Sequence, residues 1–298
     1  MHQSGDPPLS ESLPVNRRGA LGLMAGAVAA VSTGGRANLW PSAPRATTGT
    51  LKQSVCRWCY DKIPLDDLCA AAKTIGLRSV ELLDPPEWAT TSRHGLVCAM
   101  GNGPGPIAVG WNRPDHHDHL VAESERLLPL AAQAGVPNLV VFSGNRAGLS
   151  DADGIASCIA GLKRVAPLAE RAGVTLCLEL LNSKVDHADY QCDHTAWGVE
   201  VVKGVASSRV KLLYDIYHMQ IMEGDVIHTI RDNIAHIAHF HTGGVPGRAE
   251  IDDGQELNYH RIASAIVATG FDGYLAQEFI PARDPLTSLR QAVEICDA

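Results

Sequence analysis

Four side chains that can bind a metal ion or move a proton each stand at or near the end of a short apolar segment. They are Glu179, Asp215, His241 and Glu278. A carboxylate that is buried without a partner is strongly unfavourable. Three carboxylates in apolar surroundings, joined by an imidazole, therefore indicate a shared cation. Oxygen and nitrogen donors that leave room for water or substrate favour one divalent ion, such as Mn²⁺, Mg²⁺ or Co²⁺.

Further polar side chains follow Glu179 on what we expect to be a loop. Asn182, Lys184 and His187 lie there and could contact a substrate. The alternative is a solvated loop without such a role. Trp58 stands at the end of the first apolar segment after residue 50, where it could stack on a sugar or pack in the core.

Short apolar segments alternate with longer amphipathic ones from residue 53 onward. Several short segments are rich in Val, Ile and Leu and are continuous rather than alternating, which is typical of parallel strands buried on both faces. The longer segments repeat apolar residues every three or four positions, which is typical of helices. We expect eight strands, at Gln53–Trp58, Ser79–Leu83, Val97–Asn102, Asn138–Gly144, Thr175–Asn182, Val210–Tyr217, Ile237–Gly243 and Tyr274–Phe279.

Glycine stands between several expected helices and the strands that follow them. Gly76, Gly135, Gly173 and Gly270 occupy these junctions, where glycine readily adopts the left-handed turn that ends a helix. Eight strand–helix units in about 250 residues is the size of a single-domain α/β protein of the (β/α)8 TIM barrel class. The alternative is an open doubly wound sheet, but the glycine-rich loop usual after its first strand is missing here. In a barrel, the ends of the strands bring the four candidate ligands to one mouth.

The first part of the chain, residues 1–50, is typical of an export signal and linker. Arg17 and Arg18 precede an apolar, small-residue stretch at 20–31, and a polar stretch with small residues follows at 32–50. This is the order of a signal peptide, and the segment 16–23 resembles a twin-arginine (Tat) signal. The alternative is a tail without a targeting role. We predict export to the periplasm, with residues 51–298 forming the barrel domain.

The charge balance and the apolar pattern exclude two kinds of partner. The chain has 33 acidic and 25 basic residues, for a net charge of −8. Nucleic acid is therefore not expected as a partner, because no basic surplus exists to neutralise phosphates. The apolar stretch in the N-terminal segment is too short for a stable membrane span. The sequence leaves a homo-oligomer open.

Segments in the C-terminal half resemble the hydroxypyruvate isomerase-like branch of the sugar isomerase/epimerase barrels, which includes xylose isomerase-like proteins and ketose 3-epimerases. The matching segments are 178–183, 214–220, 239–248, 256–259 and 277–279. By this resemblance the four candidate ligands hold the metal, as their residue types indicate. The resemblance also implies that His218 and Arg248 hold substrate oxygens, and that Glu179 and Glu278 move the proton.

The resemblance implies a metal-dependent isomerase or epimerase that acts on a small sugar or hydroxy-keto acid through an enediolate. Hydroxypyruvate isomerases usually carry glutamine at the position of His241, whereas 3-epimerases carry histidine, so both reactions stay open. Another alternative is a metal-dependent lyase or hydrolase acting on an oxidised glycoside. A non-catalytic sugar-binding barrel would not need both glutamates. A barrel endonuclease would be disfavoured by the acidic charge.

Overall fold

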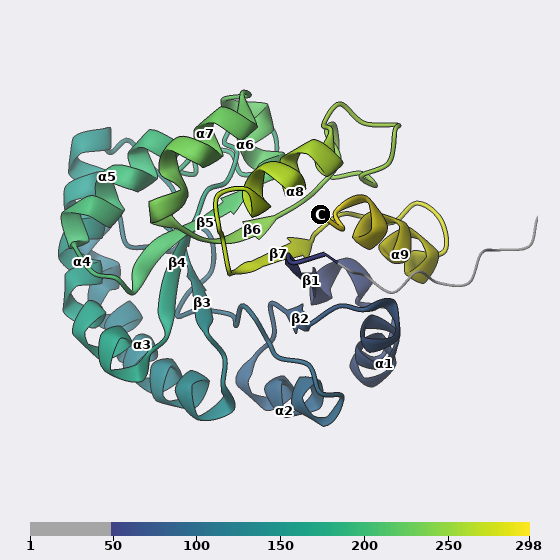
Figure 1. Cartoon of the computed structure of the whole chain (residues 1–298). Helices are drawn as coiled ribbons and strands as arrows, with labels where there is room; N and C mark the ends of the chain where they lie inside the picture. The colour runs from purple at the N-terminus through teal and green to yellow at the C-terminus, as the bar shows by residue number, and fades with distance from the viewer. Residues whose placement is uncertain (1–48) are drawn as a thin grey trace, which may run out of the picture. The chain divides into compact units, whose positions relative to one another are not determined.

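The computed structural model describes residues 49–298, and the expected export signal lies outside this range. Within it, seven parallel strands form one sheet in the order β2-β1-β7-β6-β5-β4-β3. The strands are β1 (Lys52–Cys56), β2 (Ser79–Glu81), β3 (Asn138–Val141), β4 (Thr175–Glu179), β5 (Val210–Asp215), β6 (Ile237–His241) and β7 (Tyr274–Gln277). The sheet is curled and lies inside a layer of helices (Figure 1), which confirms the TIM-barrel prediction.

The expected strand at 97–102 is present as a wall of the barrel but not as a regular strand. Bridges join Val97 to Ser79 and Gly101 to both Leu83 and Leu139, so this segment links β2 to β3. The middle of this segment does not form the regular backbone hydrogen bonds of a strand, because the Ser79 hydroxyl accepts from the backbone N–H of Ala99 at 2.9 Å. The Asn138 side chain donates to the carbonyl of Ala99 at 2.8 Å. Side chains thus replace strand hydrogen bonds, which an apolar pattern cannot predict.

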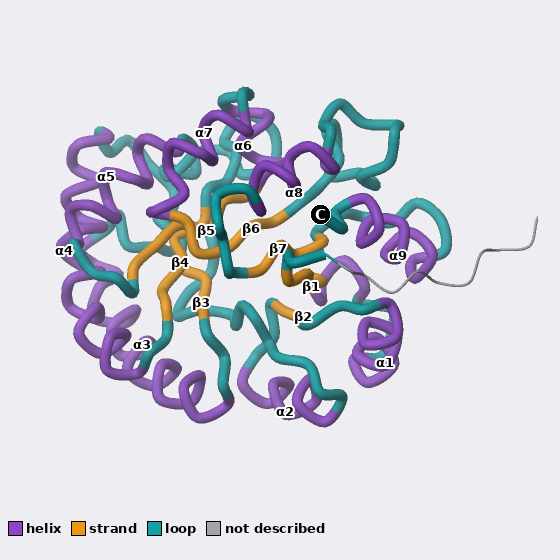
Figure 2. The backbone as a smooth tube through the Cα atoms, in the orientation of Figure 1, coloured by secondary structure: helices purple, strands orange, loops and turns teal. Residues whose placement is uncertain are grey.

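The helices follow the strands and cover their outer side, as Figure 2 shows by the purple coils around the orange strands. They are α1 (Leu65–Ile75), α2 (Pro85–Arg93), α3 (Pro114–Ala134), α4 (Asp151–Ala172), α5 (Thr195–Val205), α6 (Ile216–Met222), α7 (Val226–Asn233), α8 (Tyr259–Val267) and α9 (Pro285–Ile295), with short 3₁₀ turns at Arg57–Tyr60 and Ile234–His236. Over residues 49–298, no helix is both long enough and apolar enough to cross a membrane.

The ends of the helices follow from local chemistry that the sequence carries. Gly135 and Gly173 end α3 and α4 with φ of 73° and 70°, a left-handed conformation that glycine adopts without strain. Asp284 begins α9, where its side chain accepts from the backbone N–H of Thr287 and Pro285 takes the first helical position. Gly135 and Gly173 confirm the predicted positions of the turns between these helices and the strands that follow them.

The fifth strand, β5, ends earlier than the apolar pattern predicts. We expected a strand to Tyr217, but the chain becomes helical at Ile216. The carboxylate of Asp215 accepts from the backbone N–H of His218 at 3.1 Å, so it caps α6 as well as ending β5. This cap turns the chain immediately after Asp215 and fixes that carboxylate at the mouth of the barrel.

A buried carboxylate, Glu250, anchors the loop that carries Arg248 to this mouth. Its Oε1 accepts from the backbone N–H of Ala282 at 2.9 Å and from the Ser288 hydroxyl at 2.6 Å. Its Oε2 accepts from Arg283 Nε at 2.7 Å. Burial would raise the pKa of Glu250, but Arg283 and these hydrogen bonds outweigh it and lower the pKa to about 2. The loop is therefore tied to the start of α9 by an ionised group.

Replacing Glu250 with glutamine is expected to lower the free energy of unfolding at pH 7 by about 1.5–3 kcal/mol, the usual contribution of hydrogen bonds to a charged group. Because folding depresses this pKa, the contribution is full above the ordinary glutamate pKa and is lost as the pH falls towards about 2. Urea unfolding of both proteins between pH 7 and pH 2 measures it. The difference between them should shrink as the pH falls, and a difference independent of pH would contradict this account.

Candidate functional site

The four candidate ligands come together at the carboxyl ends of four neighbouring strands. Glu179, Asp215 and His241 are the last residues of β4, β5 and β6, and Glu278 directly follows β7. One ligand atom from each lies within 4.8 Å of all the others. All four residues are buried, with Glu179 the most exposed at 7%. The structure thus gathers the predicted quartet on one face of the barrel.

His241 offers a test of whether this group of residues suits a cation. Its Nδ1 is buried and makes no hydrogen bond of good geometry with any described residue. The atom nevertheless lies 2.8 Å from Glu278 Oε2, 3.3 Å from Glu179 Oε1 and 3.9 Å from Asp215 Oδ2. A nitrogen lone pair and three carboxylate oxygens that face one point are donors that suit a divalent ion. The residues therefore fit a metal.

Arg248 compensates only part of the negative charge. Its Nη2 lies 2.7 Å from Asp215 Oδ2, and its Nη1 lies 2.8 Å from Glu278 Oε2. Over residues 49–298, no lysine or arginine forms an ion pair with Glu179. One guanidinium thus faces two carboxylates, and among the described residues the third carboxylate, Glu179, is paired only with the imidazole of His241. Carboxylate oxygens have several lone pairs, so the bonds to Arg248 leave Asp215 and Glu278 able to bind a cation.

Burial and neighbouring charges shift the pKa values of two acids in the cluster in opposite directions. Burial raises the pKa of Asp215 to about 7, although the charge of Arg248 opposes this. Burial would also raise the pKa of Glu278, but Arg248 and His241 outweigh it and hold this pKa well below its usual range. Burial, followed by the charge of Arg248, lowers the pKa of His218 well below its usual range. His218 is therefore neutral near pH 7.

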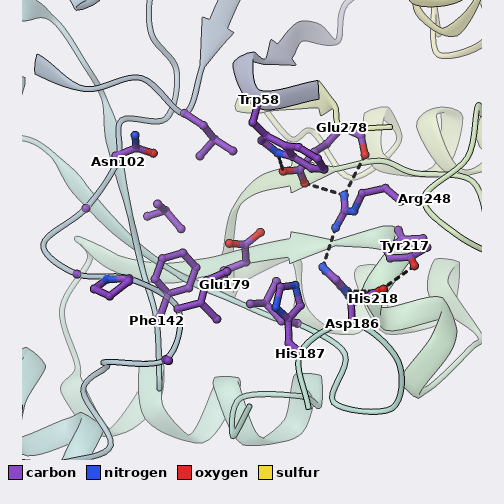
Figure 3. Close-up of a pocket in the computed structure, with 18 of the residues that line it drawn as sticks. Trp58, Asn102, Phe142, Glu179, Asp186, His187, Tyr217, His218, Arg248 and Glu278 are labelled. Carbon is purple, nitrogen blue, oxygen red and sulfur yellow. Dashed lines mark hydrogen bonds and ion pairs between the residues drawn. The ribbon is translucent and has the colours of Figure 1, made fainter. Parts of the chain in front are cut away.

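Two of the expected substrate contacts lie at the cluster itself. Arg248 Nη2 lies 2.6 Å from His218 Nε2, and both side chains line the cavity (Figure 3). The Arg248 guanidinium also lies 4.6 Å above the ring of Tyr217. Arg248 has a φ of 51°, in the left-handed region, so the backbone adopts an unfavourable conformation that directs this side chain into the site.

The expected loop residues after Glu179 differ in their placement. His187 lines the cavity. Asn182 is fully buried beneath the loop, where its Oδ1 accepts from the backbone N–H groups of Val185 and Asp186. Lys184 is turned away from the cavity, and its Nζ donates to the carbonyls at 221 and 222. Asn182 and Lys184 therefore support the loop, and neither belongs to the cavity lining.

A buried glutamate, Glu81 on β2, was missed by the sequence analysis. Its Oε1 lies 2.7 Å from His239 Nε2 and 3.0 Å from His241 Nε2, and none of its surface is exposed. Burial would raise the pKa of Glu81, but the two histidines outweigh it and lower the pKa to about 2. The sequence carried a signal, because Glu81 is another acid at the end of a buried strand.

The cluster opens into a cavity of about 830 Å³ at the mouth of the barrel. Trp58 stands at its edge with 45% of its surface exposed, and its Nε1 donates to Glu278 Oε1 at 2.6 Å. Figure 3 shows Glu179 between Phe142 on one side and the polar group of Arg248 and His218 on the other. A ligand in this cavity can reach Glu179, Glu278 and Arg248 together.

Comparisons with known proteins agree with this arrangement. Residues 69–298 match the family model described as xylose isomerase-like TIM barrel. A 2-oxo-tetronate isomerase from Cupriavidus necator is 32% identical over 238 residues, which covers 74% of this chain and 89% of that protein. A putative hydroxypyruvate isomerase from Homo sapiens is 25% identical over 237 residues, covering 78% and 80% of the two chains.

Among solved structures, a family 2 AP endonuclease from Brucella melitensis is similar with a TM-score of 0.70 and 24% identity. The match covers 80% of this chain and 97% of that one, and at this identity it supports the fold alone. The strand-end residues, the closed sheet and the match of the family model agree. The chain therefore belongs to the xylose isomerase-like TIM barrel family.

Proposed function

We propose that this protein is a metal-dependent isomerase or epimerase that acts on a small sugar or hydroxy-keto acid through an enediolate. The observation that carries the proposal is the buried Nδ1 of His241, which faces the oxygens of Glu179, Asp215 and Glu278. The isomerase activities named for the relatives support the same reaction class. Oxygen-rich donor sets of this kind suit Mn²⁺, Mg²⁺ or Co²⁺.

In this proposal the quartet of Glu179, Asp215, His241 and Glu278 holds one divalent ion. The ion supplies Lewis-acid polarisation of the substrate carbonyl, which acidifies the neighbouring C–H. Glu179 removes the proton from that carbon and later releases it to solvent, while a proton taken up from solvent reaches the intermediate through Glu278. Return to the other carbon, with the hydroxyl proton moving to the former carbonyl oxygen, gives the isomer, whereas return to the opposite face of the same carbon gives the epimer.

The remaining polar groups orient the substrate and stabilise its charge. The positive charge of Arg248 stabilises the negative charge that develops on the substrate oxygen, as oxyanion-stabilising groups do. His218, which is neutral, lies 2.6 Å from Arg248 through Nε2 and 2.6 Å from Asn182 through Nδ1, so it orients the guanidinium. His187 lines the same cavity and is a third candidate for substrate contact.

We further propose that Glu81 positions His241. An ionised carboxylate only accepts hydrogen bonds, so Nε2 of His241 donates its hydrogen to Glu81 and Nδ1 is the nitrogen left for a metal ion. Nδ1 is also the nitrogen that faces the three carboxylates. A carboxylate that orients a ligating histidine in this way usually strengthens metal binding.

The proposed function is tested by hydrogen exchange in D₂O. The Mn²⁺-loaded protein is incubated with a panel of ketoses, aldoses and hydroxy-keto acids, and deuterium at carbon is followed by NMR. Exchange is expected for at least one compound and should stop when EDTA removes the metal. A panel without any exchange, measured on folded and metal-loaded protein, would contradict enolisation.

We also propose that residues 1–50 direct export to the periplasm through a twin-arginine signal. Replacing Arg17 and Arg18 together with lysine is expected to keep the protein in the cytoplasm of a bacterial host, because the signal depends on the arginine pair. Fractionation and immunoblotting measure this. Replacing Arg36 with lysine, outside the pair, is the matched control, and equal export of both variants would contradict a twin-arginine route.

A further inference from the structure

The cavity above Glu179 is larger than a small hydroxy-keto acid requires. Its volume of about 830 Å³ is within the range of cavities that enclose drug-sized ligands. A substrate with the carbon skeleton of a tetronate fills only part of this space. The chemistry of the remaining lining therefore indicates what else the substrate carries.

One side of the cavity is apolar. Its wall is formed by the end of β3, by the segments that follow β2 and β4, and by the loop at 102–108. The apolar side chains of this wall are Leu82, Ile107, Val140, Phe142 and Leu181. Figure 3 shows Phe142 on the side of Glu179 that faces away from Arg248 and His218. Glu179 thus lies at the boundary between the polar and the apolar parts of the cavity.

Two large apolar side chains at the cavity mouth are open to solvent, on the side of Glu278. Ile280 is 52% exposed and Trp58 is 45% exposed, and both line the cavity. A ligand that covers large apolar side chains removes them from water, which favours binding. Trp58 lies next to the reacting group, since it donates a hydrogen bond to Glu278.

The apolar part provides no partner for a charged substituent. Among the described residues that line the cavity, Arg248 is the only lysine or arginine. Its guanidinium is already bonded to Asp215 and Glu278 on the polar side. A phosphate is usually bound by free cationic or N–H donors. Without a second lysine or arginine among the described lining residues, a charged group on the apolar side would have no cationic side chain to pair with.

We propose that the apolar part of the cavity is a subsite for an uncharged alkyl or aryl group of the substrate, adjoining the hydroxyl–carbonyl pair that reacts at Glu179. The reacting end of this substrate rests on the proposed function, whereas the apolar end rests on the lining alone. A sugar joined to an apolar group, or a hydroxy ketone with an alkyl chain, has this chemistry. Sugar phosphates do not.

A series of 1-hydroxy-2-ketones tests the subsite, from hydroxyacetone to 1-hydroxy-2-octanone. Every member has the same reacting group, and the members differ only in the length of the alkyl chain. Isothermal titration of the Mn²⁺-loaded full chain measures their affinities. Each added methylene is expected to raise the affinity by about fourfold while it enters the apolar part. An affinity that does not rise with chain length would overturn the proposal.

Three variants test which residues cause the rise in affinity with chain length. Ile107→Asn and Phe142→Asn lie in different segments of the wall, and each is expected to reduce the gain per methylene. Leu130→Asn is the matched control, because Leu130 is 38% exposed on α3 and does not line the cavity. Circular dichroism checks the fold of each variant, and either wall variant alone suffices if the other fails to fold. An equal gain in affinity per methylene in the wall variants and in the control would also overturn the proposal.

The binding series can be separated from the proposed reaction. Affinities that rise with chain length, without deuterium exchange in any ligand, would support the subsite and contradict the enolisation. Deuterium exchange in sugars, together with a flat chain-length series, would contradict the subsite and leave the enolisation in place. The two inferences therefore fail on different observations.

Discussion

Replacing Glu179 with glutamine is expected to slow deuterium exchange into the substrate by about 10²- to 10⁴-fold, the usual contribution of a general base. Glu179 is the one carboxylate of the cluster without an arginine or lysine partner among residues 49–298. It also faces the cavity between the polar and apolar walls (Figure 3). Glutamine keeps the size and one oxygen of the side chain, so the fold should be retained. NMR of the recovered substrate measures the exchange.

Glu278→Gln separates the two proton transfers. If Glu179 removes the proton and Glu278 delivers a proton to form the product, this variant should still exchange deuterium into the recovered substrate, while product formation falls. Glu200→Gln, on the exposed face of α5, is the matched control and should behave as the wild type. Full activity of Glu179→Gln would end the assignment of Glu179 as the base.

Replacing Glu81 with alanine is expected to weaken Mn²⁺ binding by about 10- to 100-fold, the usual effect of losing a carboxylate that orients a ligating histidine. Glu81 does not face the cavity, so this loss must act through His241. Glu81→Gln keeps an acceptor oxygen for both histidines but removes the charge, and its Mn²⁺ affinity should lie between those of alanine and the wild type. Isothermal titration with Mn²⁺ measures all three.

A purely structural role for Glu81 predicts a different outcome. In that case the variants would lose stability, but the folded fraction would bind Mn²⁺ as the wild type does. Nitrogen-15 NMR of the histidine side chains gives an independent readout. Without the Glu81 acceptor, His241 should no longer favour the tautomer that carries its hydrogen on Nε2. Glu125→Ala, exposed on α3, is the control. Wild-type Mn²⁺ affinity in Glu81→Ala would contradict the positioning role.

The sequence predicted the barrel and the position of the quartet because both depend on local patterns. Continuous apolar segments indicate strands buried on both faces, and parallel strands in a barrel end on one face. Glu179, Asp215 and His241 each end such a strand. Their convergence therefore follows from the topology, without knowledge of any side-chain contact. The helix ends at Gly135 and Gly173 could be predicted for the same reason, since a left-handed turn needs only one residue type.

Other features depend on contacts between distant segments, which no local pattern records. Glu81 ends a short strand far from His241 in sequence, and only the closed sheet brings their side chains to 3.0 Å. The irregular segment at 97–102 reflects the side chains of Ser79 and Asn138. Lys184 was expected near the substrate, but the turn after β4 directs its Nζ to carbonyl groups near the end of α6. The conformation of the loop determines where a side chain such as that of Lys184 lies.

The most direct measurement of the central claim is the binding of Mn²⁺ to the metal-free protein, followed by electron paramagnetic resonance with equilibrium dialysis. The account predicts one ion per chain, with affinity reduced at least tenfold in Asp215→Asn, since that variant removes a charged donor from the quartet. Asp118→Asn is the matched control, because its side chain is 93% exposed on α3. Absence of a bound ion, or equal affinity in the two variants, would contradict the account.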